Sequence, residues 1–172
     1  MKLLVTLNFD EEGQSILYQH MLNFFEKCES GIFTKRENIH ITLAYIDEST
    51  NVGSVVKIIE DMDESQFDIK LSDSGEFRRS GSDIYWIGIE KSNELARLQK
   101  VICRKLSGEG VMTDNDSKLH LTVSRDTVVD KDAIPKASFD RKIPVKRISL
   151  MKYECTRSGS VYTEVYAKEL RA

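Results

Sequence analysis

Two histidines of the chain stand in the same short pattern, 80 residues apart. His40 lies in ENIHITLAYID and His120 in SKLHLTVSRDT, and in both an apolar residue flanks the histidine on each side. Thr42 and Thr122 each follow their histidine by two positions. Because strand side chains alternate between the two faces of a sheet, each histidine shares a face with its threonine. Each segment therefore predicts a strand with a polar face carrying His and Thr and an apolar face beneath it.

A predicted helix precedes each of these strands, which indicates two similar halves whose histidine strands face each other across a cleft. Hydrophobic periodicity predicts three helices in all, with hairpins as well as β-α-β stretches, so the fold class is α+β. No Pro- or Gly-rich linker divides residues 1–172, and we expect a single two-lobed domain. The helices are predicted over 11–28, 51–62 and 95–106, and the main strands over 2–9, 38–46, 67–71, 84–90, 119–125, 143–154 and 161–168.

The composition limits which ligands we expect the protein to bind and in which compartment we expect it. The net charge of −3 argues against coating long nucleic acid, which needs a basic face, but leaves room for a small anionic ligand. The three cysteines are widely separated and odd in number, as expected of reduced thiols in the cytoplasm. The apolar start MKLLVTLNFD is too short to span a membrane. We expect a cytoplasmic monomer without membrane contacts.

The paired motifs suit the cleavage of a phosphodiester. One group must take a proton from the nucleophile and another must give a proton to the leaving oxygen, and imidazole can do either near neutral pH. His40 and His120 are the candidate acid and base. The hydroxyls of Thr42 and Thr122 can donate to the non-bridging phosphate oxygens. Arg125 falls on the opposite face of an ideal strand, so it either joins the phosphate site through a bulge or makes a surface ion pair.

The sequence gives no support for a metal site, a serine nucleophile or a phosphate-binding loop. The chain has no His-x-His, no H-E-x-x-H and no Cys/His cluster, so we expect no metal and no other cofactor. It also lacks a G-x-S-x-G motif and a Gly-rich phosphate loop. His20, the third histidine, lies within the first predicted helix and is expected to be structural.

With both tripeptides, the chain resembles the 2H phosphoesterase superfamily, and most closely its RNA 2′,3′-cyclic phosphodiesterase branch, also called 2′-5′ RNA ligases. The similarity extends over KLLVTLNFD, RENIHITLAYIDE, YWIGIE, KLHLTVSR and GSVYTEVYAKEL. The chain departs from the usual family pattern at Arg36, Tyr45, Leu119 and Val123, none of which removes a catalytic group.

The resemblance implies two antiparallel sheets with helices on their outer faces, forming a V-shaped groove, and hydrolysis without metal. RNA 3′ ends or small cyclic nucleotides would be opened to a 2′-phosphomonoester. In one assignment His40 protonates the leaving oxygen and His120 activates water, and the reverse assignment stays open. Phe9, Tyr45 and Tyr162 are candidates for stacking a base, each with a core position as the alternative. The alternative function is a nucleotide- or RNA-end-binding module without the reaction.

Overall fold

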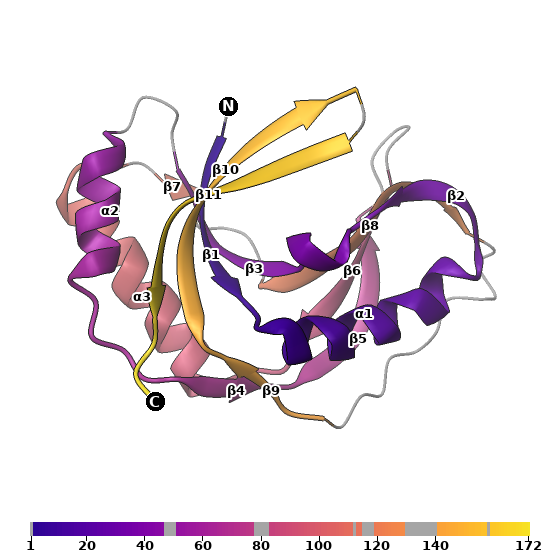
Figure 1. Cartoon of the computed structure of the whole chain (residues 1–172), viewed down its shortest axis with the longest axis horizontal. Coiled ribbons are helices and arrows are strands. Elements are labelled where there is room, and N and C mark those ends of the chain that lie inside the picture. The colour runs from indigo at the N-terminus through magenta and orange to yellow at the C-terminus, as the bar shows by residue number, and fades with distance from the viewer. Residues whose placement is uncertain are drawn as a thin grey trace.

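The computed structural model describes residues 2–46, 51–77, 83–111, 113–114, 119–129, 141–157 and 159–172. Helices and antiparallel strands are mixed along the chain, which confirms the α+β class (Figure 1). The helices are α1 (Glu11–Phe25), the 3₁₀ turn η1 (Arg36–Asn38), α2 (Val52–Glu60) and α3 (Asn93–Gly108). The strands are β1 (Lys2–Asn8), β2 (Cys28–Phe33), β3 (His40–Ile46), β4 (Phe67–Ile69), β5 (Leu71–Phe77), β6 (Ile84–Ile89), β7 (Thr113–Asp114), β8 (His120–Val129), β9 (Ile143–Val145), β10 (Arg147–Thr156) and β11 (Gly159–Glu169).

Two sheets carry the two motifs. The first has the order β11-β10-β1-β3-β7 and includes the His40 strand. The second has the order β2-β8-β6-β5 and includes the His120 strand. A separate pair, β4 and β9, completes the described strands, and all of these pairings are antiparallel. The long hairpin of β10 and β11 projects from the body of the molecule (Figure 1).

Each sheet is covered by helices on the face opposite to its motif. The apolar stripes of α2 and α3 pack on the first sheet, where Leu43 and Leu150 are fully buried. Helix α1 covers the second sheet, and the rings of Phe24 and Tyr85 lie 5.1 Å apart there. One hydrophobic cluster runs beneath both sheets. The apolar faces of the two motif strands thus face the core, as the alternating pattern predicts.

The helix starts follow their caps, but the first helix is shorter than predicted. The Asp10 side chain accepts from the Gly13 backbone N–H, and the Ser92 hydroxyl accepts from Leu95. Helix α1 ends at Phe25 instead of residue 28, and β2 begins at Cys28. The apolar spacing continues to Cys28 because that residue still packs against the core as the first residue of a strand.

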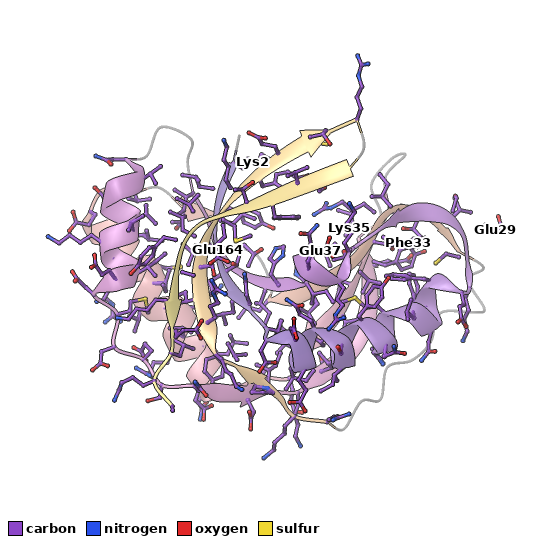
Figure 2. The ribbon with its side chains drawn as sticks, viewed as in Figure 1. Lys2, Glu29, Phe33, Lys35, Glu37 and Glu164 are labelled. Atoms are coloured by element: carbon purple, nitrogen blue, oxygen red, sulfur yellow. The ribbon has the colours of Figure 1, made fainter. Side chains whose placement is uncertain are left out.

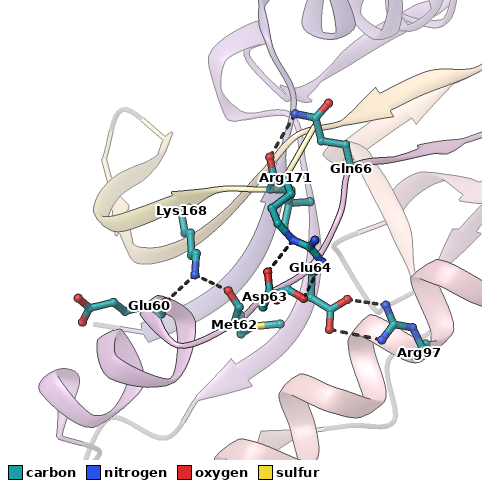
Figure 3. A network of polar contacts seen from close by, with 9 residues as sticks. Glu60, Met62, Asp63, Glu64, Gln66, Arg97, Lys168 and Arg171 are labelled. Carbon is teal, nitrogen blue, oxygen red and sulfur yellow. Dashed lines mark hydrogen bonds and ion pairs between the residues drawn. The ribbon is translucent and has the colours of Figure 1, made fainter.

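The C-terminal end of the chain is fastened to the end of α2 by a polar network (Figure 3). The Lys168 ammonium donates to the carbonyl oxygens of Glu60, at 2.5 Å, and Met62. Arg171 pairs with Asp63, and its backbone N–H donates to the Glu64 carbonyl at 2.9 Å. A cation at a helix C-terminus satisfies carbonyls that lack a partner within the helix and interacts favourably with the helix dipole.

Replacing Lys168 with methionine is expected to lower the free energy of unfolding by about 1–3 kcal/mol. The apolar part of the side chain is kept, but two carbonyls at the end of α2 lose their donor. Urea unfolding followed by circular dichroism measures the loss. Lys100→Met, on the exposed side of α3 and away from its ends, is the matched control. Equal stabilities of the two variants would show that the network contributes nothing.

Candidate active site

The two histidines come from different sheets and meet between them. His40 is the first residue of β3 and His120 the first residue of β8. The strands β3 and β8 contact each other, and the charge of His120 influences the pKa of His40. The structure therefore brings together the two groups that the sequence pattern paired.

A β-bulge interrupts β3 directly after the threonine of its motif. The neighbouring β1 residues Val5 and Thr6 pair with Ala44 and Thr42, so Leu43 is an extra residue in β3. Leu43 and Ala44 are both fully buried. A bulge of this kind shifts the alternation of side chains beyond it by one residue.

The same irregularity recurs in β8. The neighbouring β6 residues Tyr85 and Trp86 pair with Ser124 and Thr122, so Val123 is the extra residue. Val123 and Ser124 are both buried, like their counterparts in β3. The two halves thus share a bulge at the same position after the threonine, as well as the His-x-Thr motif.

The bulges decide where the fifth residue after each histidine lies. In an ideal strand this residue would point to the core, but after a bulge it returns to the face of the histidine. Tyr45 pairs with Leu4 on the face that also carries Thr42 and His40. Arg125 lines the same pocket as His40 and Thr122. Of the two alternatives for Arg125, the structure shows the position in the pocket; that Arg125 binds phosphate stays a prediction.

Arg125 crosses from the second sheet to the first. Its guanidinium lies within hydrogen-bonding reach of the Tyr162 hydroxyl, and its charge acts on His40. Burial raises the pKa of Tyr162 to about 12, with Arg125 opposing that rise, so the phenol keeps its proton at neutral pH. The Tyr162 ring lies 4.9 Å from the His40 ring, measured between centroids. Arg125 thus brings a permanent positive charge close to the half-buried imidazole of His40.

The protonation of His40 is set by its surroundings. Its Nδ1 lies 2.6 Å from the backbone carbonyl of Asn38, which can only accept, so Nδ1 carries a proton and Nε2 is the nitrogen that can accept one. Burial lowers the pKa of His40 below its ordinary value of 6.5. The carbonyl of Asn38 raises the pKa, while the positive charges of Arg125 and His120 lower it further. Neutral His40 is therefore the favoured form in the free protein at neutral pH.

A second aromatic ring stands beside His120. Trp86 lies opposite Thr122 on β6, and the ring centroids of Trp86 and His120 are 6.2 Å apart. The indole lies directly over Gly75 of β5, where a Cβ would come within 2.3 Å of the ring. Glycine at this position leaves the space that the indole occupies. Each catalytic histidine candidate thus has an aromatic neighbour, Tyr162 for His40 and Trp86 for His120.

Among the stacking candidates, Phe9 occupies the core position that was its alternative. Its side chain is only 5% exposed, belongs to the core cluster and does not line the pocket. The residue follows the end of β1, where the alternation of that strand no longer determines its direction. Tyr45 lies on the histidine face of its sheet, and Tyr162 lines the pocket.

Sequence reasoning missed three contributors to this region. Asn38 acts through its backbone carbonyl, which no side-chain pattern can reveal. Thr34 holds the bulged strand, because its hydroxyl donates to the Thr122 carbonyl at 2.7 Å and its N–H donates to Val123 at 2.9 Å. Trp86 could have been found from the pairing of segments 84–90 and 119–125, since both were predicted as strands.

Within the described ranges, no group of three or more His, Cys, Asp or Glu side chains is arranged to hold a metal ion. The described helices are all too short or too polar to span a bilayer.

A model of the 2′-5′ RNA ligase superfamily matches residues 28–157. The match includes both His-x-Thr motifs and both bulges. The chain belongs to the 2′-5′ RNA ligase superfamily. This confirms the family predicted from the two motifs and places the protein among the hydrolases of the 2H phosphoesterase type.

Relatives of this superfamily match along nearly the whole chain. The RNA 2′,3′-cyclic phosphodiesterase of Thermotoga maritima is 21% identical over 96% of this chain and 94% of its own length. The structure of E. coli LigT complexed with 3′-AMP superposes with a TM-score of 0.75 at 20% identity, covering 98% of this chain and 96% of LigT. The TT0787 protein of Thermus thermophilus gives a TM-score of 0.81 at 18% identity, over 99% and 98% of the two chains. At these identities the structural matches establish the fold alone.

Proposed function

We propose that the protein is a metal-independent cyclic phosphodiesterase that opens 2′,3′-cyclic phosphates at RNA ends or on small nucleotides. The observation that carries the proposal is the convergence of His40, Thr122 and Arg125 on one pocket, with His120 beside it. The names of the Thermotoga relative and of the LigT complex with 3′-AMP support this substrate class.

The reaction needs one proton acceptor and one proton donor. Water attacks phosphorus, the bond from phosphorus to O3′ breaks, and a 2′-phosphomonoester remains. One imidazole takes the proton from water while the other gives a proton to O3′. The Arg125 guanidinium and the threonine hydroxyls stabilise the charge that builds on the non-bridging oxygens. All of these groups come from the chain itself.

The lowered pKa of His40 favours one of the two assignments. A neutral imidazole with a free Nε2 is a proton acceptor, so we assign His40 as the general base and His120 as the general acid. This reverses the order considered first from the family resemblance. The assignment follows from the burial of His40 and from the two positive charges near it.

This assignment makes a prediction about pH. Because the base must be unprotonated and the acid protonated, kcat/KM should follow a bell-shaped pH profile, whose acid limb lies below the ordinary histidine value of about 6.5, at the lowered pKa of His40. Arg125→Gln removes a positive charge and should raise that pKa, which NMR titration of the His40 ring can follow without any turnover. A His40 pKa above 6.5 in the free wild-type protein, or no rise of that pKa in Arg125→Gln, would contradict the assignment.

A substrate panel tests the function itself. The protein is incubated, with excess chelator, with 2′,3′-cyclic AMP, 3′,5′-cyclic AMP and a short RNA ending in a 2′,3′-cyclic phosphate. We expect hydrolysis of the two 2′,3′-cyclic substrates only, and the phosphate at the 2′ position by ³¹P NMR. Tight binding of 3′-AMP with no hydrolysis of any substrate would favour the binding-module alternative. The expected cytoplasmic location and monomeric state stay predictions.

A further inference from the structure

The pocket extends to one side of the two histidines. Its lining includes His40, Thr122 and Arg125, and it continues between the connection from β2 to η1 and the start of β11. Among the described residues, His120 is not part of that lining. A cyclic phosphate held by His40 and Arg125 would therefore have its nucleoside on the side of β2 and β11.

The walls of this extension suit a nucleoside. Ile32, Phe33 and Tyr162 provide apolar and aromatic surface, and Asn38 and Ser160 add polar groups. Ile32 is 47% exposed, so its apolar side chain is accessible from the pocket that it lines. The Tyr162 ring is fixed between Tyr153, 5.0 Å away, and His40. A preformed aromatic surface of this kind can stack a base at a low entropic cost.

Lys35 stands at the rim of this extension and is held there by its neighbours. On one side, Thr34 is bonded to the backbone of Thr122 and Val123. On the other side, the Arg36 guanidinium donates to the Ser15 hydroxyl at 2.6 Å and to the Glu11 carbonyl at 3.1 Å. The backbone between these anchors has little freedom to move Lys35 away from the pocket.

The two basic residues of this connection have different roles. Arg36 is engaged with α1, whereas the Lys35 ammonium makes no hydrogen bond or ion pair with any residue in the described ranges. Lys35 is exposed and lines the pocket. Its side chain lies in the region where the connection from β2 to η1 faces the β10–β11 hairpin (Figure 2). An ammonium group in this position is available to an anionic ligand.

We propose that Lys35 binds the phosphate on the 5′ side of the nucleotide that carries the cyclic phosphate. The inference rests on the proposed function and narrows its substrate class. Once the cyclic phosphate lies beside His40 and Arg125, the nucleoside fills the extension, and its 5′ oxygen is directed to the rim. The substrates favoured are RNA 3′ ends, or nucleotides with a 5′ phosphate, over cyclic nucleosides with a free 5′ hydroxyl.

The test compares two substrates that differ only in this phosphate, 2′,3′-cyclic AMP and 5′-phosphoadenosine 2′,3′-cyclic phosphate. The wild-type protein should favour the second by roughly 10-fold in kcat/KM, the size of one charge-assisted contact. The ratio should fall to about 1 in Lys35→Gln, stay near the wild-type value in Lys35→Arg, and shrink as salt is added. Lys57→Gln, exposed on α2, is the matched charge control and should keep the full ratio.

Equal kcat/KM values for the two substrates in the wild-type protein, or an unchanged ratio in Lys35→Gln, would overturn the proposal. If neither substrate is hydrolysed, the proposed function fails, and binding then tests Lys35 separately. Calorimetry would compare adenosine 3′-monophosphate with adenosine 3′,5′-bisphosphate. A preference for the bisphosphate that Lys35→Gln abolishes supports the Lys35 contact, and equal dissociation constants contradict it.

Discussion

Replacing either His40 or His120 with alanine is expected to lower kcat by roughly 10²–10⁴-fold, the range contributed by one positioned acid or base. Each variant removes either the proton donor or the proton acceptor and leaves Arg125 in place. The variant with both replacements should have a kcat only slightly below that of the less active single variant, because the two imidazoles act in one step. Steady-state kinetics on a 2′,3′-cyclic nucleotide measures both effects.

His20→Ala is the control for these variants. His20 lies in α1, which covers the opposite side of the second sheet, and burial lowers its pKa. This variant should keep the wild-type kcat when it is assayed well below its unfolding temperature, where a small loss of stability leaves the protein folded. Unchanged kcat in His40→Ala or in His120→Ala, with the fold intact by circular dichroism, would exclude a two-histidine mechanism.

The second large effect is expected at Arg125. Removing one positioned donor to the developing phosphate charge typically costs about 10²–10³-fold in kcat, and we expect this loss in Arg125→Ala. Arg125→Lys should recover only part of it, because an ammonium lacks the planar fork that matches two phosphate oxygens. Arg104→Ala, exposed on α3, is the matched control and should be neutral.

The outcome at Arg125 also tests the bulge. If Arg125 pointed away from the pocket, as in an ideal strand, Arg125→Ala would behave like the Arg104 control. If Arg125 instead made a surface ion pair, Arg125→Ala would lower the free energy of unfolding and leave kcat unchanged. A loss of kcat with an unchanged free energy of unfolding is the result that places its guanidinium on the phosphate.

The motif pair was readable from the sequence because it depends on local alternation. His40 and Thr42 share a face in any strand, and the same holds for the second motif, so the main catalytic candidates needed no tertiary information. The bulges were not readable, because Leu43 and Val123 are apolar residues in apolar runs and fit regular pairing equally well. The position of Arg125 therefore became clear only from the strand register.

Other differences have equally local causes. Cys28 continues the helical spacing of α1 but begins β2, since a half-buried side chain satisfies either pattern. Phe9 follows a regular strand, so its burial depends on how the chain turns into α1, where its Cβ lies 3.1 Å from the position of a Cβ on Gly13. The nitrogen of His40 that can accept a proton is fixed by a backbone carbonyl, which leaves no trace in the sequence.

Metal-independent opening of a 2′,3′-cyclic phosphate is tested most directly by a single turnover in ¹⁸O-labelled water with excess chelator, using a short RNA that ends in a 2′,3′-cyclic phosphate. Mass spectrometry and ³¹P NMR then report how many labelled oxygens the product carries and where its phosphate lies. We expect one labelled oxygen in a 2′-phosphomonoester, formed at the same rate with and without chelator. Loss of the reaction in chelator, or a 3′-phosphomonoester as the product, would contradict the proposed function.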